Sequence, residues 1–297
     1  MLHILDLHFQ VPNSIAAFVV ETSEGPVLVE CGPHSVFPHL KAGVQGLGYR
    51  MEDIRHLFLS HIHFDHAGAA WALAELGAQV YVHPVGYPHL LDPARLYNSA
   101  KRIYGDQMER LWGLMKPIPE AQLVAVADGQ TITVGDHHFR AWHTPGHATH
   151  HIAWQMGETI FTGDVAGCSI NGGPVVPPCP PPDINLEDWT HSIDKLLALQ
   201  PRRLYLTHFG EVGQVQPHFE ALKHIMWDWA NWIRPHFDAG RRPEEVVPAF
   251  QAYTNQQLLD AGLDQEAIAK YEAANPAWMS VAGLMRYWKK RKEQIGS

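Results

Sequence analysis

The sequence predicts an α/β fold, built as a four-layer αββα sandwich with a C-terminal helical appendage. Short runs rich in Val, Ile, Leu, Phe or Thr alternate with helical segments through residues 1–210, and Gly, Pro, Asp or Asn bound most of them. After about Gly210 the strand patterns disappear and only helical patterns continue. Strands interleaved with helices are typical of two packed sheets that carry helices on their outer faces.

The strand-like segments are short and lie almost entirely in the first part of the chain. They are Leu2–Phe9, Ile15–Glu21, Val27–Glu30, Leu57–Ser60, Val80–His83, Leu123–Val126, Thr131–Val134, His138–His143, His151–Met156, Thr159–Thr162 and Leu204–Thr207. Helices are expected at Ala67–Leu76, which stops at Gly77, and at Leu186–Leu199. Further helices are expected at Gln214–Phe237, Pro243–Lys270 and Trp278–Lys292.

These patterns also suggest how the chain is divided. We expect one catalytic domain over residues 1–210 and a C-terminal helical region over residues 211–297. A helical insertion at about 84–119 carries Tyr97, Tyr104 and Trp112. Aromatic side chains bury much apolar area, so this insertion is either ordinary core or a lid over a substrate pocket. The hypothesis to test is the lid, with Tyr97 and Tyr104 influencing substrate preference.

Composition excludes several classes of protein. Hydrophobic residues make up 46% of the chain and charged residues 18%, as in ordinary folded proteins. The net charge of −9 gives no electrostatic reason to bind phosphate backbones, so no nucleic-acid partner is expected. No apolar run reaches the roughly 20 residues that span a bilayer, and three cysteines suit a reducing compartment. We therefore expect a cytoplasmic protein with a small-molecule substrate and no membrane partner, and leave a homo-oligomer open.

The strongest chemical signal is a cluster of ligand-type residues directly after the predicted strand Leu57–Ser60. It contains His61, His63, Asp65 and His66. Alternate residues of a strand share a face, so His61 and His63 should point the same way. The turn into the next helix should bring Asp65 and His66 in from another direction. Four such side chains at this spacing rarely arise from packing, and they suit two adjacent metal ions.

Further ligand-type residues follow later strands. They are His147 after Thr-Pro-Gly, Asp164 after Thr-Gly, and His208 after Leu-Thr. Taken singly, each is more simply explained as part of a turn. Each also lies just past a strand end, where a rigid scaffold presents functional side chains. Their order after the first cluster therefore indicates one shared metal site.

The ordered pattern resembles the metallo-β-lactamase fold superfamily, and most closely its glyoxalase II and lactonase-like branch. The residues that carry the resemblance are His61, His63, Asp65, His66, His147, Asp164 and His208. It covers about residues 1–210 and implies the metallo-β-lactamase form of the αββα sandwich. It also implies two divalent metal ions. The implied ligands of the first ion are His61, His63 and His147, those of the second are Asp65, His66 and His208, and Asp164 bridges both.

The resemblance implies a hydrolase in which a metal-bridging hydroxide attacks a small ester, thioester or lactone. Asp65 is the expected proton acceptor. Zinc is the expected metal, with iron or manganese as alternatives, because nitrogen and oxygen donors do not distinguish among them. Two other functions stay open: a mononuclear iron sulfur dioxygenase of the persulfide dioxygenase kind, and a phosphodiesterase. One bound iron would favour the dioxygenase, and two metal ions favour hydrolysis.

Positions that recognise substrate in these relatives differ in this chain. Lactonases carry a tyrosine at the position of Gly167. Glyoxalase II carries a tyrosine at the position of Gly210 and a lysine at the position of Gly173. Neither substrate signature is present, so the sequence indicates the reaction class without naming the substrate.

Three residues near the predicted ligands are candidates for supporting roles. Many superfamily members carry an aspartate near the end of an early strand, where it supports the ligand loop, and Glu30 is expected to replace it here. His150 and His151 adjoin the loop of His147. Either one is a candidate for orienting a ligand or the substrate.

Overall fold

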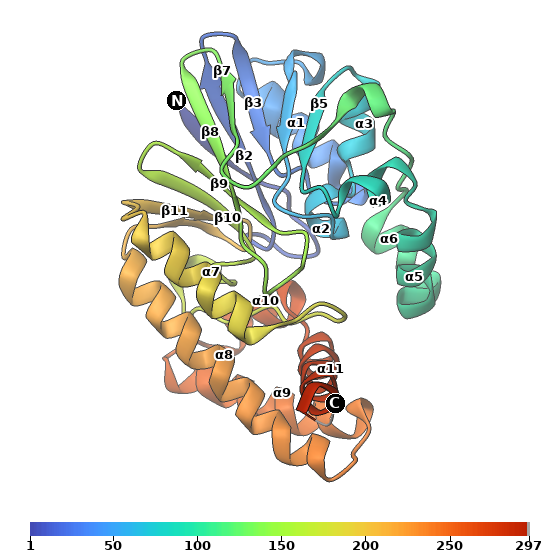
Figure 1. Cartoon of the computed structure of the whole chain (residues 1–297), viewed down its shortest axis with the longest axis vertical. Coiled ribbons are helices and arrows are strands. Elements are labelled where there is room, and N and C mark those ends of the chain that lie inside the picture. The colour runs from blue at the N-terminus through green and yellow to red at the C-terminus, as the bar shows by residue number, and fades with distance from the viewer. Residues whose placement is uncertain (296–297) are drawn as a thin grey trace.

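The computed structural model describes residues 1–295 and contains two six-stranded sheets packed face to face (Figure 1). The first sheet has the order β1-β2-β3-β4-β5-β6. Its strands are β1 (Leu2–Asp6), β2 (Ala16–Thr22), β3 (Gly25–Val29), β4 (His56–Phe58), β5 (Gln79–Val82) and β6 (Leu123–Ala125). The second sheet has the order β12-β11-β10-β9-β8-β7. Its strands are β7 (Thr131–Val134), β8 (His137–His143), β9 (Ile152–Met156), β10 (Thr159–Gly163), β11 (Arg203–Leu206) and β12 (Gly210–Val212).

Both sheets are mixed, and their parallel strands place functional loops at a common edge. In the first sheet β3, β4, β5 and β6 run parallel, while β1 and β2 form an antiparallel meander with β3. In the second sheet β10 and β11 run parallel. The carboxyl ends of parallel strands meet at one edge of a sheet, so the loops after β4, β10 and β11 are brought toward one another.

Aromatic side chains fill the space between the two sheets. The ring of Phe58 on β4 lies 4.5 Å from that of Phe139 on β8 and 4.8 Å from that of Trp154 on β9. All three side chains are fully buried. Packing of this kind holds the sheets face to face at a fixed separation, so the strand ends that carry the ligands keep their relative positions.

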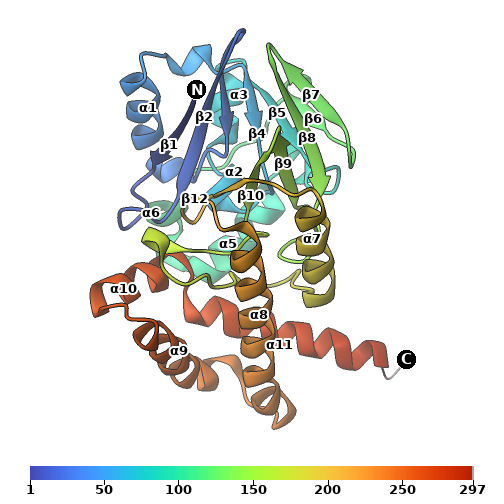
Figure 2. The ribbon, with the colours of Figure 1, turned by 90° about the vertical axis from the view of Figure 1, so that its left-hand side faces the viewer.

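Helices cover both outer faces of the sandwich (Figures 1 and 2). The helices packed against the first sheet are α1 (Phe37–Gly46), α2 (Phe64–Ala67), α3 (Ala70–Glu75), α4 (Tyr87–Leu91), α5 (Ala94–Tyr104) and α6 (Met108–Trp112). On the side of the second sheet, α7 (Leu186–Ala198) and α8 (Val215–Asp238) pack against each other. The helices α9 (Pro243–Asp260), α10 (Gln265–Ala274) and α11 (Ala277–Ile295) extend the same core beyond the sandwich, with α11 against α8 and α9, and α10 against α9. The predicted αββα sandwich is confirmed, and so are C-terminal helices. The division into residues 1–210 and 211–297 as separate domains stays a prediction.

Some predicted elements were wrong in extent. The single helix expected at Ala67–Leu76 is two, α2 and α3. The helix expected at Pro243–Lys270 is also two, because Gly262 has φ +89° and the Asp264 side chain caps a new start at α10. Helix α1 was missed, since only Leu40 and Val44 of its side chains are buried and the apolar pattern is weak. Strand β12 was also missed, because it is three residues long and lies past the point where the strand patterns end.

Among residues 1–295, no helix is both long enough and apolar enough to cross a bilayer. The cytoplasmic location stays a prediction.

Candidate metal centre

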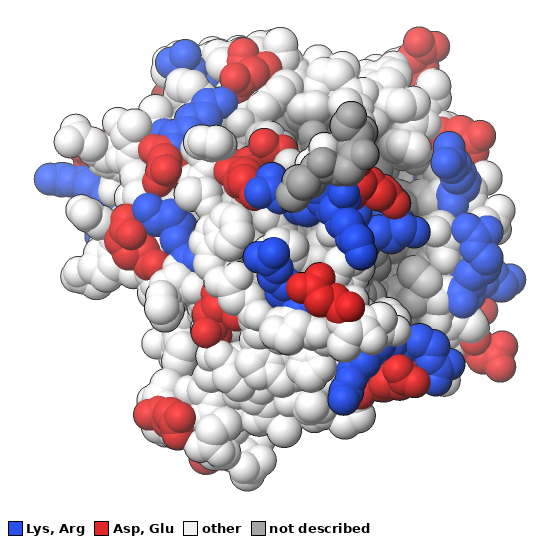
Figure 3. Space-filling view, turned by 60° about the horizontal axis from the view of Figure 1, so that its bottom comes forward, with Lys and Arg blue, Asp and Glu red and all other residues white. Residues whose placement is uncertain are grey.

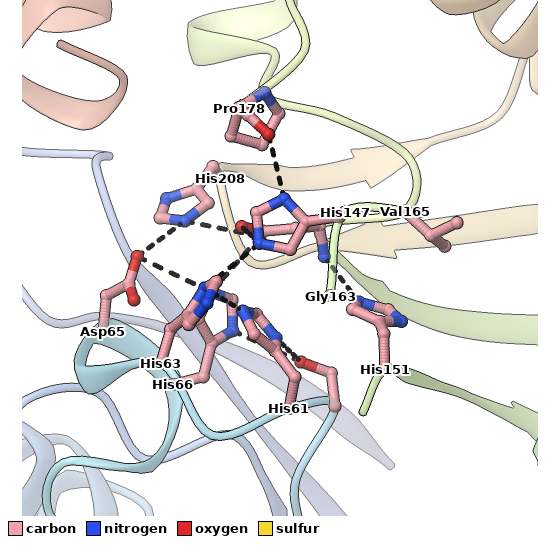
Figure 4. Close-up of polar contacts among 12 residues, drawn as sticks. His61, His63, Asp65, His66, His147, His151, Gly163, Val165, Pro178 and His208 are labelled. Carbon is pink, nitrogen blue, oxygen red and sulfur yellow. Dashed lines mark hydrogen bonds and ion pairs between the residues drawn. The ribbon is translucent and has the colours of Figure 1, made fainter. Parts of the chain in front are cut away.

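The seven predicted ligands lie together at one end of the sandwich, where loops from both sheets meet (Figure 4). They form two sets, and within each set the candidate ligand atoms lie within 4.8 Å of one another: His61, His63 and His147 in one, and Asp65, His66, Asp164 and His208 in the other. Each set joins segments that are far apart in the chain. The loop after β4 contributes to both.

In the first set, three imidazole nitrogens converge. His63 Nδ1 lies 2.8 Å from His61 Nε2 and 3.1 Å from His147 Nε2. His61 and His147 are buried, and His63 faces the cavity described below. One imidazole proton cannot serve all of these nitrogens at once, whereas a single cation accepts a lone pair from each.

Asp164 connects the two sets. Its Oδ2 lies 3.2 Å from His147 Nε2, in the first set. Its Oδ1 lies 3.2 Å from His66 Nε2 and 3.5 Å from His208 Nε2, in the second. One carboxylate thus presents an oxygen to each set, which is the arrangement expected of a ligand that bridges two cations.

Two buried atoms of the second set lack a hydrogen bond. His66 Nε2 and Asp164 Oδ1 are shielded from solvent, and neither makes a hydrogen bond despite their proximity. A buried polar atom without a partner costs free energy, so such atoms are rare in native proteins. A divalent cation between them would satisfy both, and the residues present therefore fit the two-metal site that the fold family implies.

The protonation states of His63 and Asp65 suit cation binding. Burial, together with the nearby His147, lowers the pKa of His63 to about 4. Burial acts to raise the pKa of Asp65, but His66 and His208 outweigh it and lower that pKa to about 2. At neutral pH His63 is therefore neutral and Asp65 ionised, the forms in which these side chains bind metal ions.

The far nitrogen of most ligand imidazoles is held by a hydrogen bond. The partners are Ser60 Oγ for His61 at 2.9 Å, the Pro178 carbonyl for His147 at 2.9 Å, and the Ser14 carbonyl for His208 at 2.6 Å. A carbonyl accepts only from an N–H, so Nδ1 of His147 and His208 carries the proton and Nε2 presents its lone pair to the centre. Sequence patterns gave no sign of Ser14 or Pro178, since they act through the backbone.

Glu30 supports the ligand loop as predicted. Its Oε1 accepts a hydrogen bond from the backbone N–H of Ser60 at 3.0 Å. Its Oε2 lies 3.3 Å from Nδ1 of His66. The glutamate is 1% exposed, so these contacts are made in a water-poor interior. Glu30 therefore fixes the start of the ligand loop by a hydrogen bond and places a carboxylate oxygen beside the His66 ring.

His151 orients the bridging aspartate. Its Nε2 accepts a hydrogen bond from the backbone N–H of Asp164 at 3.1 Å, and its Nδ1 lies 2.8 Å from Thr144 Oγ1. Because Nε2 is the acceptor, Nδ1 carries the proton and donates to the threonine. The prediction that a histidine beside the His147 loop orients a ligand thus has a geometric basis in His151.

A cavity of about 520 Å³ opens onto both sets of ligands. His63, Asp65 and Asp164 line it from the metal centre. His150 lines it as well: its Nδ1 has no hydrogen-bond partner, and its Nε2 lies 4.0 Å from Asp183 Oδ2. His150 is therefore placed to contact a bound molecule, whereas His151 contacts the protein alone.

The segment 84–119 lies beside the metal centre. Residues of α5, among them Tyr104, line the cavity together with Trp112 of α6. The prediction that Tyr97 faces the substrate was wrong. Tyr97 is not one of the described residues that line the cavity, and its ring packs 6.2 Å from that of Phe64 in the hydrophobic core. The C-terminal helices contribute Trp278 and Met279 to the lining.

Packing explains why two substrate-recognition positions are glycine. Gly167 has φ +74°, and a Cβ there would lie 2.8 Å from the Val176 carbonyl oxygen. A Cβ at Gly173 would lie 2.6 Å from the hydroxyl of Tyr271 on α10. A larger side chain is blocked by backbone at Gly167 and would displace the Tyr271 hydroxyl at Gly173, so substrate recognition in this chain depends on other residues.

The profile of the metallo-beta-lactamase superfamily matches residues 11–208. The metallo-beta-lactamase fold-containing protein ST1585 of Sulfurisphaera tokodaii is 28% identical over 167 residues, covering 55% of this chain and 63% of that protein. A probable polyketide biosynthesis zinc-dependent hydrolase, BaeB of Bacillus velezensis, is 29% identical, covering 54% and 59%. A hydroxyacylglutathione hydrolase of Maricaulis maris is 28% identical, covering 52% and 48%. The chain thus matches between about half and two thirds of each relative's length.

Solved structures agree with the fold. The ST1585 structure superposes with a TM-score of 0.62 at 25% identity, covering 76% of this chain and 86% of that one. TTHA1429 from Thermus thermophilus gives a TM-score of 0.69 at 20% identity and covers 98% and 94%, so the likeness of fold extends over the C-terminal helices. TTHA1623 in a di-iron-bound form gives a TM-score of 0.52 at 28% identity, and the match covers 71% of this chain and 94% of that one.

Proposed function

The chain belongs to the metallo-beta-lactamase superfamily, and from that premise we propose that it is a dinuclear, zinc-dependent hydrolase of carboxylic esters, thioesters or lactones. The observation that carries the proposal is the position of Asp164, whose two carboxylate oxygens face different sets of ligands. A carboxylate shared in this way suits two cations. A mononuclear iron dioxygenase would need one set only, so this geometry favours the hydrolase.

Each ligand set has a definite task in this proposal. His61, His63 and His147 would hold one ion, Asp65, His66 and His208 the other, and Asp164 both. Two bound cations supply Lewis acidity, which activates a water molecule and polarises the scissile carbonyl. The nitrogen and oxygen donors suit zinc. A zinc-dependent hydrolase among the relatives supports that choice, and a di-iron form of another makes iron the alternative to measure.

Asp65 is the residue that we propose as proton acceptor. Its side chain is 22% exposed, whereas that of Asp164 is 3% exposed. Its Oδ2 faces His66 and His208, at 3.6 and 3.4 Å, and it lines the cavity. Asp65 is ionised at neutral pH and lines the cavity, and we propose from this position that it takes a proton from the attacking water and passes it to the leaving group.

The cavity determines what kind of partner the site admits. A volume of about 520 Å³ lies within the range of roughly 300–1,000 Å³ that is typical of small-molecule sites. The face that Figure 3 shows mixes basic with acidic residues. Two basic side chains of α11, Arg286 and Lys290, donate hydrogen bonds to the Pro182 carbonyl. These features support a small-molecule substrate in preference to a nucleic acid.

The test is a substrate panel on purified, zinc-loaded protein. We expect turnover of p-nitrophenyl esters, thioesters or lactones that is lost on chelation and restored by zinc. Bis(p-nitrophenyl) phosphate and a persulfide, the latter with iron-loaded protein, represent the rival functions. Turnover of the phosphodiester alone, or oxygen consumption with the persulfide, would overturn the proposal.

A further inference from the structure

We propose that the substrate carries an apolar chain, and that this chain lies between α5 and α11 in the cavity above the metal centre. The inference rests on the proposed hydrolysis, because it identifies the group attached to the scissile bond. The apolar chain could belong to the acyl side or to the alcohol side of an ester, and the experiment below separates these sources.

Exposed apolar side chains gather at this cavity. Among the described residues only eight large hydrophobic side chains are exposed, and three of them, Val85, Ile103 and Trp278, line it. Ile103 is 56% exposed and Val85 49%. Single exposed apolar residues are common, but several around one concave site mark a surface that binds an apolar partner.

Two segments distant in the chain build this wall together. Tyr104, at the end of α5, donates a hydrogen bond to Met279 Sδ of α11 at 3.5 Å. Its ring lies 6.0 Å from that of Trp278 and 5.3 Å from that of Trp112. Tyr104 thus ties α5 to α11. The aromatic side chains around it present a continuous apolar wall to the cavity.

The proline-rich loop completes the wall, and several of its carbonyl groups are already hydrogen-bonded. Pro178, Pro180, Pro181 and Pro182 line the cavity and lack backbone N–H groups. The Pro182 carbonyl accepts hydrogen bonds from α11, and the Pro177 carbonyl accepts one from Asn275 Nδ2 at 3.1 Å. Because these acceptors have partners already, the loop offers a substrate mainly apolar contacts.

Polar groups are densest at the metal end of the cavity, where Asp65, Asp164 and the ligand histidines lie, with His150 and Asp183 beside them. Helix α5 adds Arg95 and Ser99 to the lining as well as Ile103. A molecule with a polar end at the ligands and an apolar chain along Ile103 and Trp278 fits this arrangement. An ester or thioester with a hydrocarbon chain has this form, with its carbonyl at the ligands and its chain along Ile103 and Trp278.

Binding and turnover test the inference separately. Calorimetric titration of the zinc-loaded full chain should show that octanoate binds at least tenfold more tightly than acetate, with a more negative heat-capacity change. In turnover, kcat/KM should rise roughly threefold per methylene from p-nitrophenyl acetate toward the octanoate. Ethyl acetate against hexyl acetate tests the alcohol side. A rise in one series identifies the side that carries the chain.

Matched substitutions show where the apolar chain of the substrate binds. Ile103→Gln should reduce the preference for the octanoate over the acetate ester about tenfold, measured as the ratio of their kcat/KM values. Leu259→Gln is the control, because Leu259 is an exposed leucine of α9 that does not line the cavity. Equal binding of octanoate and acetate, or an identical chain-length profile in Ile103→Gln, would overturn the inference. Tight octanoate binding without hydrolysis of any ester would support the apolar site and defeat the proposed function.

Discussion

The two ends of the cavity are built in opposite ways. At the metal end, ligands from loops at strand ends are buried and held by hydrogen bonds, such as those that Glu30 makes to Ser60 and His151 to Asp164. At the apolar end, the wall comes from helices on different parts of the chain, and Ile103 and Trp278 stay exposed. In our proposals the reaction takes place at the hydrogen-bonded metal end, and the substrate is selected at the apolar end.

The largest expected effect comes from breaking the metal end. His63→Ala removes the nitrogen that lies within 3.1 Å of both His61 and His147 Nε2. We expect hydrolysis to fall by several orders of magnitude, because activation of water depends on the metal ions. The sheets do not rely on His63, so the circular dichroism spectrum should be unchanged. Full activity in a folded His63→Ala protein would contradict the assignment of the ligand.

A smaller effect is expected from the residue that orients Asp164. His151→Phe removes the acceptor for the Asp164 N–H and leaves that buried group without a partner. Outer partners of metal ligands contribute roughly 10–100-fold to metal affinity or activity, and we expect zinc affinity to fall within that range. His138→Phe, at an exposed position of β8, is the control. Equal zinc affinity in both variants would mean that His151 has no positioning role.

Changes at the apolar end should affect stability more than chemistry. A Cβ at Gly283 of α11 would overlap the carbonyl oxygen of Cys179 in the proline-rich loop. Gly283→Ala should therefore lower the free energy of unfolding by about 1–3 kcal/mol, as overpacking does, and displace α11 from the loop. Gly213→Ala is the control, since nothing lies within 4 Å of that position.

Urea unfolding of both proteins measures the difference. We also expect Gly283→Ala to bind zinc normally, because α11 supplies none of the ligands. If Gly283→Ala were as stable as Gly213→Ala, the tight contact between α11 and the loop would be wrong. Loss of zinc from Gly283→Ala would instead mean that the two ends of the cavity depend on each other.

The smallest expected effect lies outside the cavity, at His83. Burial and the adjacent His143 lower the pKa of His83 from 6.5 to about 4. A lowered pKa in the folded state means that the unfolded chain takes up the proton first. The contribution of His83 to the free energy of unfolding should therefore be fully present above pH 6.5 and decline as the pH falls from 6.5 to 4. His83→Gln should show a shallower loss of unfolding free energy over this interval, measured against wild type at each pH.

The two ends also differed in how well the sequence predicted them. The ligands lie in short motifs at strand ends, so spacing alone indicated His61, His63, Asp65 and His66, and chain order added the rest. The apolar wall depends on a contact between Tyr104 and Met279, 175 residues apart, which no local pattern encodes. Tyr97 and Tyr104 are similar in sequence context, yet Tyr97 packs against Phe64 and only Tyr104 lines the cavity.

Supporting contacts show the same limit. Glu30 was predictable from the resemblance, because many superfamily members carry an aspartate near the end of that strand, and His151 was predictable because it adjoins a ligand loop. The carbonyl groups of Ser14 and Pro178 orient His208 and His147, but any residue has a carbonyl, so the sequence carries no signal for them. Tertiary packing decides which backbone groups reach the ligands.

Metal content is the most direct test of the central claim. Purified, metal-replete protein should contain two metal ions per chain by elemental analysis, with zinc as the expected element. Asp164→Ala should lose occupancy at both positions, because its carboxylate faces both sets of ligands. A single tightly bound ion per wild-type chain, unchanged by excess metal and unaffected by Asp164→Ala, would contradict the dinuclear centre.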